Sequence, residues 1–303
     1  ASVALSCNFF GLKSIIFMTR DSYLKKPYRV NLMQLAKAIV YPSPSNATKC
    51  GRKLYKENPN HSGSLGIGMG EAMEFVRSSS KYRLALGCMS YYAALHQTII
   101  GLETQAQLKS VNIKPDIMIA CVGGGSNFVG FTAPFIGEKL KKKNKIRFLA
   151  VESANIPSLT KGTYKYDYQD YYGYTPMVKM LTLGHKFVPP QLHSGGLRYH
   201  GKTPILSLLV TKGVVEPHSI KQEDAFIANK IFYETEGVLA APESGHAIAQ
   251  TILEAKKAKR AKKTPAIIFC LSGNGFLDLA GYAKVFGLHT TELYHEKKSS
   301  NHE

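Results

Sequence analysis

The feature that most constrains the fold is a glycine loop between a buried strand and a helix. Residues 117–122 form a short apolar run that predicts a strand, and a predicted helix follows the loop to about Lys141. Residues 147–151 then predict a second strand. Strands that alternate with helices are typical of a parallel sheet flanked by helices. We therefore predict the α/β class with parallel-rich sheets, and 303 residues are enough for two domains.

This loop is a candidate anion site. Glycines let backbone N–H groups approach a phosphate closely, and the N-terminus of the following helix adds partial positive charge. The candidate phosphate-binding residues are Gly123, Gly124, Gly125, Ser126 and Asn127. The last two also carry side-chain donors. A tight turn that binds no ligand is the competing interpretation, because strand-to-helix turns often use glycine.

The loop does not match the common nucleotide motifs. A dinucleotide site needs glycine at the first, third and sixth positions, and the sixth position counted from Gly123 is Phe128. The motif G-x-x-x-x-G-K-[ST] does not occur in the sequence. Glu152, at the end of the next predicted strand, could replace the ribose-binding acid. A nucleotide-binding oxidoreductase is therefore kept as a remote alternative.

A second glycine loop follows a predicted strand at 266–271 and begins with Ser272 and Gly273. It would lie at the carboxyl edge of the same sheet, where open α/β sheets bind ligands. The Ser272 hydroxyl could bond a ring nitrogen without forcing its protonation, or it could simply end the strand. Glu243 lies at a predicted helix start, where capping of the helix is an alternative to a role in the site.

Composition restricts the partners only partly. There are 39 Lys plus Arg and 21 Asp plus Glu, and the formal net charge of +18 admits nucleic acid, an anionic membrane or a small anion as a partner. The basic runs at 139–147 and 256–263 lack interleaved aromatic residues, so they do not predict a base-stacking surface. The apolar stretches are much shorter than the roughly 20 residues of a membrane span. We expect no nucleic-acid partner and no membrane segment.

The cysteines and histidines predict no metal centre. The 5 cysteines are scattered and never form C-x-x-C, which fits a reducing compartment. His193 and His200 do not have the spacing of a helical zinc pair. We expect a cytoplasmic location and leave a plastid location open.

A series of short motifs resembles a known family. The motifs lie, in the family's order, at residues 66–73, 96–103, 123–127, 157–162, 182–185, 193–201, 236–246 and 271–273. In this order they resemble the tryptophan synthase beta chain, in its second, divergent type, within the fold-type II pyridoxal-phosphate enzymes. The resemblance covers nearly the whole chain except its tail, and it implies a two-domain architecture.

The resemblance implies roles for individual residues. The loop 123–127 would hold the phosphate of pyridoxal 5′-phosphate, Ser272 would face its pyridine nitrogen, and Glu243 would lie near its ring. Gly273 would also contribute to cofactor binding. Arg198 would meet the serine substrate. The implied reaction is a β-replacement, in which L-serine and indole give L-tryptophan. A homodimer and an alpha subunit are the implied protein partners.

Two of the family's motifs have no match in this sequence. The Schiff-base lysine, in Ser-His-Lys, and the substrate-carboxylate loop precede the position that Ala1 matches. We therefore expect an incomplete N-terminal domain over 1–113, a cofactor-phosphate domain over 114–288 and a flexible tail over 289–303, and a chain that is inactive alone. The alternatives are a non-catalytic truncated homologue and a fold-type II lyase or deaminase that acts on another amino acid.

Overall fold

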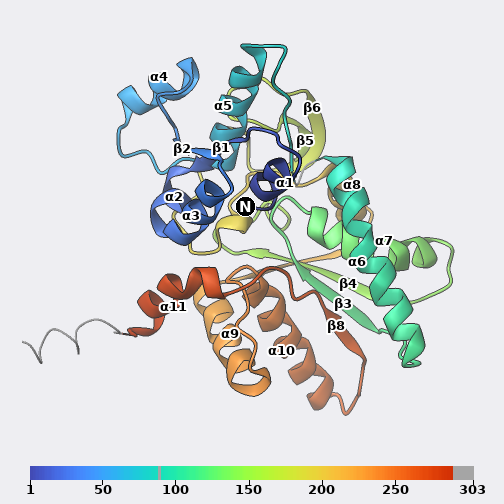
Figure 1. Ribbon diagram of the computed structural model, residues 1–303. Helices are drawn as coiled ribbons and strands as arrows, with labels where there is room; N and C mark the ends of the chain where they lie inside the picture. The colour runs from blue at the N-terminus through green and yellow to red at the C-terminus, as the bar shows by residue number, and fades with distance from the viewer. Residues whose placement is uncertain (88–89, 289–303) are drawn as a thin grey trace, which may run out of the picture.

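The computed structural model describes residues 1–87 and 90–288, whose helices and strands form two groups (Figure 1). The larger group surrounds a parallel sheet, and the smaller contains the N-terminal elements. The α/β prediction is confirmed. Among the described residues, no helix combines the length and hydropathy needed to cross a membrane. The predicted flexible tail, 289–303, lies outside the described residues.

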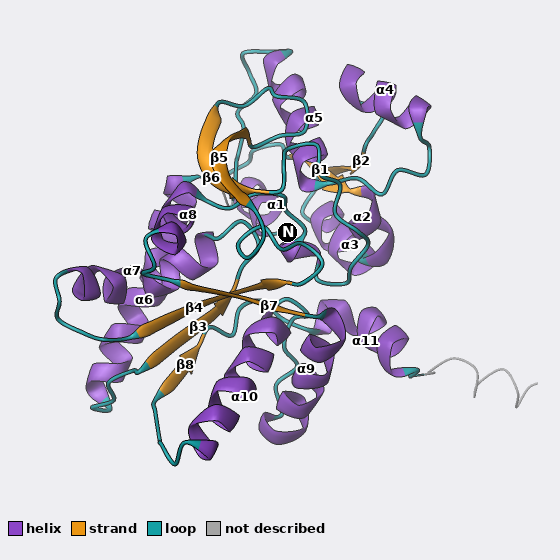
Figure 2. Cartoon of the chain, turned by 180° about the vertical axis from the view of Figure 1, so that it is seen from behind, coloured by secondary structure: helices purple, strands orange, loops and turns teal. Residues whose placement is uncertain are grey.

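The larger group centres on a parallel sheet with the strand order β7-β4-β3-β8. Its strands are β3 (Ile117–Cys121), β4 (Arg147–Ser153), β7 (Glu216–Ile220) and β8 (Ile267–Phe269). One face is covered by α9 (Gln222–Glu236) and α10 (Ser244–Arg260), and the other by α6 (Tyr91–Ser110), α7 (Ser126–Leu140) and α8 (Pro204–Thr211) (Figure 2). The sheet is therefore enclosed between two helical layers.

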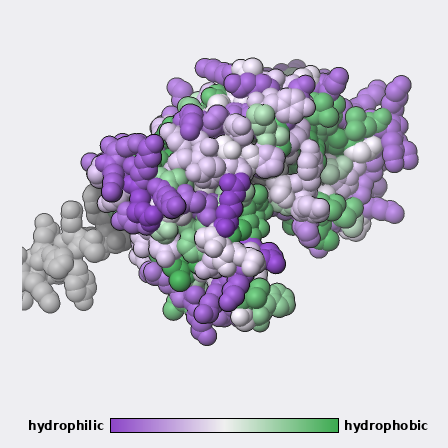
Figure 3. All heavy atoms as spheres, turned by 90° about the horizontal axis from the view of Figure 1, so that it is seen from above, coloured by the Kyte–Doolittle hydropathy of each residue, from purple (hydrophilic) through white to green (hydrophobic). Residues whose placement is uncertain are grey.

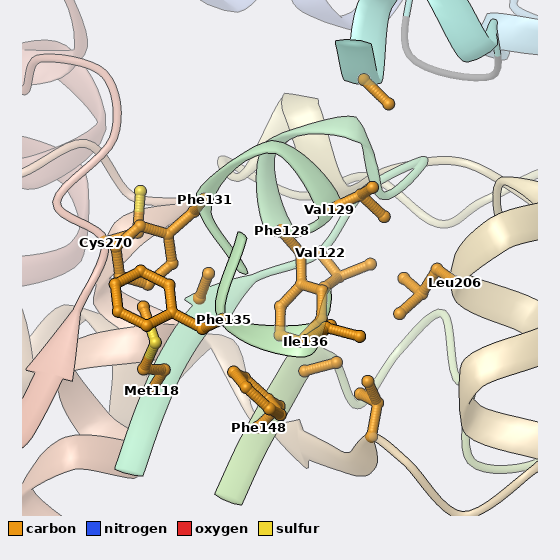
Figure 4. Close-up of a cluster of buried hydrophobic side chains, with 14 of the residues drawn as sticks. Met118, Val122, Phe128, Val129, Phe131, Phe135, Ile136, Phe148, Leu206 and Cys270 are labelled. Carbon is orange, nitrogen blue, oxygen red and sulfur yellow. The ribbon is translucent and has the colours of Figure 1, made fainter. Parts of the chain in front are cut away.

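Alternate side chains of β3 enter two different cores. Met118 and Ala120 belong to the core on the α7 side, whereas Ile119 and Cys121 belong to the core on the side of α9 and α10. Figure 4 shows the first of these cores, where phenylalanines of α7 lie close to Met118 and Phe148. Because both faces of β3 are buried, apolar residues are needed at every position, which makes this strand easy to predict from sequence.

The smaller group is built on a parallel pair of strands, β1 (Ile15–Thr19) and β2 (Ile39–Ser43). Its helices are α1 (Ser2–Phe9), α2 (Arg20–Lys25), α3 (Pro27–Leu35), α4 (Lys49–Glu57) and α5 (Leu65–Arg77). Ala4, Met33 and Ala38 are buried together and form the centre of a small core. Parallel pairing in both groups confirms the prediction of parallel-rich sheets.

An antiparallel pair, β5 (Thr163–Tyr168) and β6 (Met177–Thr182), is the exception to the parallel pairing. The sequence predicts an irregular segment at 164–174, and this prediction is wrong for its first half. Most of the β5 side chains are exposed or half-buried, so the strand lacks the apolar signal that identifies β3. The remaining short elements are η1 (Gly195–Leu197), η2 (Phe276–Asp278) and α11 (Leu279–Phe286).

Helix α4 lies within a segment, 45–66, that the sequence predicts to be a polar loop. The Thr48 hydroxyl accepts the Gly51 N–H and caps this helix. Lysine, arginine and glutamate occupy most of its positions, which makes the segment polar on average, but Cys50 and Leu54 lie four residues apart on one face at the spacing of a helix. The capping threonine is the signal that could have placed its start.

The sequence predicts a helix only from about Glu71, but helix α5 begins earlier, at Leu65. The Ser64 hydroxyl caps it by accepting an N–H of the first turn. The glycines at positions 66, 68 and 70 make this segment resemble a loop in the sequence, but in the structure they allow close packing of the helix. A Cβ at Gly70 would lie 2.3 Å from the Tyr172 ring.

Helices α6 and α7 cross where each carries a glycine. A Cβ at Gly101 would lie 2.6 Å from the Gly130 carbonyl oxygen, and a Cβ at Gly130 would lie 2.5 Å from the Cβ of Gln97. The two backbones therefore approach without a side chain between them. The predicted domain boundary at 113/114 lies after α6, so this contact joins the two predicted domains. The boundary itself stays a prediction.

We expect Gly130→Ala to lower the free energy of unfolding by about 1–3 kcal/mol, because the added methyl group overpacks the crossing. The control is Gly137→Ala in the same helix, where a Cβ meets no atom within 4 Å. Alanine should stabilise the helix there by about 0.5–1 kcal/mol. Urea unfolding measures both effects. Equal effects of the two substitutions would contradict the close crossing.

Candidate functional site

The loop between β3 and α7 is shaped by contacts that exclude side chains. Gly125, immediately before α7, has a φ of 114°, and a Cβ there would lie 2.6 Å from the Thr203 methyl carbon. A Cβ at Gly123 would lie 2.0 Å from the Gly196 carbonyl oxygen. Glycine is therefore required at both positions. The loop leads into the N-terminus of α7, where the first backbone N–H groups have no partner within the helix.

The segment after η1 holds this loop in place. The Thr203 N–H donates to the Gly124 carbonyl at 2.7 Å, and the Lys202 ammonium donates to the Gly123 carbonyl at 2.8 Å. Lys202 is fully buried, and its Nζ lies 3.5 Å from an oxygen of the equally buried Glu152. A positive charge, balanced by a carboxylate, therefore lies against the loop in a dry environment.

Two buried donors at the loop have no hydrogen-bond partner among the described residues. They are the Asn127 side-chain nitrogen and the Thr203 hydroxyl. Nearly all buried polar groups in proteins are hydrogen-bonded, so a pair of unpaired donors beside unpaired helix N–H groups indicates ligand atoms at this position. Their chemistry fits a phosphate, which only accepts hydrogen bonds when fully ionised. The arrangement favours the anion-site interpretation over the empty-turn alternative.

The second glycine loop lies at the same edge of the sheet. The Ser272 hydroxyl is 3.1 Å from the Ser244 hydroxyl, at the start of α10, and 3.6 Å from the sulfur of Cys121, the last residue of β3. The next residue, Gly273, has a φ of 75°. Burial raises the pKa of the Cys121 thiol to about 12, so the thiol stays neutral beside Ser272. The predicted meeting of the two loops at one edge is confirmed.

Glu243 reaches away from the helix that it precedes. It occupies the N-cap position of α10, but its side chain makes no capping hydrogen bond. One carboxylate oxygen accepts the Gly196 N–H at 2.8 Å and lies 3.6 Å from the Lys26 ammonium. The capping alternative is therefore wrong. The carboxylate is instead held against the loop that also touches Gly123.

Arg198 lies in the loop that contains Gly196 and is almost completely buried. Its guanidinium donates to an oxygen of Asp21 at 2.6 Å and to the Pro189 carbonyl at 3.1 Å. Asp21 belongs to α2, so this ion pair joins the smaller group to the loop. The structure thus assigns the guanidinium a structural partner, and its contact with a substrate stays a prediction.

A second ion-pair cluster joins the smaller group of elements to η2. The buried Lys26 ammonium lies 2.9 Å from Asp278, and Arg29 bonds the other oxygen of Asp278 at 2.6 Å. Sequence reasoning missed Lys26, and it also missed Lys202. Neither lysine belongs to a recognisable motif, and the chain has many other basic residues. The only sequence clue to a functional role is that Lys202 directly follows the loop 193–201.

A family model described as "Pyridoxal-phosphate dependent enzyme" matches residues 1–273. The chain is 50% identical over 275 residues to the tryptophan synthase beta chain 2 of Aeropyrum pernix, covering 90% of this chain and 61% of that protein. It is also 50% identical over 273 residues to the tryptophan synthase beta chain 2 of Thermotoga maritima, covering 90% of this chain and 64% of that protein. The chain thus spans less than two thirds of these relatives' lengths.

Two solved structures share the fold at low sequence identity. A fungal L-serine ammonia-lyase from Rhizomucor miehei matches with a TM-score of 0.66 and 14% identity, covering 95% of this chain and 78% of that one. A bacterial threonine deaminase matches with a TM-score of 0.62 and 16% identity, covering 90% of this chain and 73% of that one. At such identities the likeness shows the arrangement of elements only.

The match of the family model spans both groups of elements and includes the first glycine loop and the start of the second, Ser272 and Gly273. The family's cofactor, pyridoxal phosphate, carries a phosphate that the unpaired donors at the first loop fit. The predicted fold class and cofactor therefore agree with the match. On this evidence the chain belongs to the family of pyridoxal-phosphate-dependent enzymes.

Proposed function

We propose that the chain belongs to a tryptophan-synthase-type lyase that joins L-serine and indole to give L-tryptophan. The observation that carries the proposal is the loop 123–127 with its two unpaired buried donors, at the edge where Ser272 also lies. The identity to chains named tryptophan synthase beta chain supports the choice of substrates. The deaminase-like solved structures do not favour another substrate, because their likeness concerns the fold alone.

Some residues of the site would bind the cofactor, and others would orient the groups that bind it. We infer that the backbone N–H groups of the loop 123–127, together with Asn127 and Thr203, bind the cofactor phosphate. Lys202 holds the loop from behind through the Gly123 carbonyl. Glu243 is fixed by the Gly196 N–H and would lie near the ring of a bound cofactor. The bound cofactor supplies a ring that withdraws electrons from the α-carbon of an amino acid.

The partner of the ring nitrogen sets the strength of this electron withdrawal. Ser272 is uncharged, and its neighbours Ser244 and Cys121 are uncharged as well. A neutral hydroxyl does not force the ring nitrogen to be protonated, whereas an aspartate would. The weaker electron sink that results suits elimination and replacement at the β-carbon better than transamination.

Two protein partners are also proposed, a second copy of the chain and an alpha subunit. A homodimer is supported by exposed apolar side chains on α1 and α6, among them Phe9, Tyr92 and Leu95. An alpha subunit is proposed only because the named relatives are beta chains. Both proposals concern the whole protein.

We expect Asn127→Asp to weaken binding of pyridoxal phosphate about 10- to 100-fold, because it replaces an unpaired donor with a negative charge facing the phosphate. Binding of pyridoxal, which lacks the phosphate, should not change. Isothermal titration measures both affinities. The control is Asn155→Asp at an exposed position. Equal binding of pyridoxal phosphate by the native and Asn127→Asp proteins would contradict the phosphate site.

The two buried lysines near the site already have partners. Lys26 contacts Glu243 and Asp278, and Lys202 contacts Gly123 and Glu152. We therefore mix the 303-residue chain with one equivalent of pyridoxal phosphate and reduce the mixture with borohydride. We expect each lysine to be modified in only a minor share of the molecules. Peptide mapping by mass spectrometry makes the measurement. Near-complete modification of one lysine would show that this chain supplies its own covalent anchor.

The choice of substrate is tested on the protein as its organism makes it. With pyridoxal phosphate, L-serine and indole, we expect L-tryptophan to form, measured by chromatography. Release of a 2-oxo acid from serine or threonine, at a rate that indole does not reduce, would instead favour a deaminase. This outcome would overturn the substrates while leaving the phosphate site intact.

A further inference from the structure

A cavity of about 820 Å³ lies between α4, α5 and the segment that joins β5 to β6. None of the residues of the two glycine loops lines it, and neither does Glu243. Its walls belong to the end of the molecule that Figure 3 shows from above, where hydrophilic side chains are interspersed with side chains of intermediate and high hydropathy. The proposed function uses none of its lining residues. Its volume is in the range of small-molecule sites.

One wall of the cavity is aromatic. Tyr171, Tyr172 and Tyr174 follow β5 in sequence, and all three line the cavity while half-buried. The rings of Tyr172 and Tyr174 are stacked, with centroids 5.6 Å apart and planes 23° from parallel. The Tyr171 ring meets Tyr172 edge-on at 5.3 Å. The Tyr172 hydroxyl donates to the Cys50 carbonyl at 3.4 Å, which fixes the wall against α4.

Two cations are held against this wall. The Lys186 ammonium lies 4.2 Å from the centre of the Tyr171 ring. The Arg77 guanidinium lies 5.4 Å from the centre of the Tyr174 ring and donates to the Tyr174 carbonyl at 2.9 Å. Cations over aromatic faces are stabilised by the ring quadrupole, so both charges are positioned before any ligand arrives.

Helix α4 adds two lysines to the lining of the cavity. Lys49 and Lys53 are four residues apart in α4, so they share one face of that helix. Among the residues that the structure describes, these two lysines, Arg77 and Lys186 form no ion pair. Two carboxylates also line the cavity. Glu74 accepts the N–H groups at the start of α4, and Glu57 lies at the other end of that helix, so the lining has four cations and two carboxylates.

We propose that this cavity binds an organic anion that carries a planar aromatic ring, as a nucleoside monophosphate does. The ring would stack on the tyrosine wall, and the anionic group would meet Lys186, Arg77 and the lysines of α4. Aromatic faces add binding energy for a ring but little for a bare anion, and the cations add little for an uncharged ring. The combination therefore selects a ligand with both parts.

Equilibrium binding in the Asn127→Asp protein tests the proposal, because this substitution weakens the phosphate site at the glycine loop. The probes are adenosine 5′-monophosphate, adenosine and inorganic phosphate. We expect the monophosphate to bind at least about tenfold more tightly than either of the other two. Failure of the monophosphate to bind, or binding no tighter than that of inorganic phosphate, would overturn the proposal.

Substitutions locate the binding. Lys186→Gln and Tyr174→Leu should each weaken binding of the monophosphate about 5- to 10-fold. The first removes one cation, and the second removes an aromatic ring of the wall that also positions Arg77. Lys256→Gln, at an exposed position of α10, is the charge-matched control and should have no effect. Circular dichroism confirms that each variant is folded. Unchanged binding in Lys186→Gln and Tyr174→Leu would place the ligand elsewhere and refute this cavity as its site.

Discussion

The site depends on places where the backbone of a glycine lies so close to another segment that a side chain on the glycine would have no room. Gly123 meets the Gly196 carbonyl, and Gly125 meets Thr203, although each pair is far apart in sequence. These contacts force the segment after η1 to follow the loop closely and bring Lys202 against it. A methyl group at either glycine would push the two segments apart. The shape of the phosphate loop is therefore set by long-range packing as much as by its own sequence.

Buried ion pairs also fix the position of one segment against another, here between the two groups of elements. Asp21 and Arg198 are each almost fully buried, and Lys26 lies with Asp278 in a second buried pair. Removing one partner of a buried pair typically costs about 3–5 kcal/mol, because the other charge remains in a dry environment. Such pairs are therefore better understood as constraints on geometry than as sources of net stability. The first pair holds α2 against the loop that carries Gly196, and the second holds the start of α3 against η2.

The sequence predicts the parts of this chain in which local pattern and environment agree. β3 is buried on both faces and therefore uniformly apolar, and the glycine loop is recognisable by its composition. α4 and β5 are not predicted because both are polar on average. Their periodic signals are short: Cys50 and Leu54 lie four residues apart in α4, and tyrosine occupies every second position of β5. Lys202 and Thr203 are missed for another reason. They belong to the site only because a distant segment folds back on Gly123, and a single sequence does not record that contact.

The neutral surroundings of Ser272 have a consequence for how the protein responds to acidity. Serine hydroxyls do not ionise in water near neutral pH, and burial moves the pKa of the Cys121 thiol out of the same range. These two groups therefore keep the same charge over the pH values at which cells operate. The Glu243 carboxylate acts electrostatically on Cys121 and also contributes to the field at this edge of the sheet. A change of that field with pH would come from such ionisable groups and not from the hydroxyl that faces the ligand.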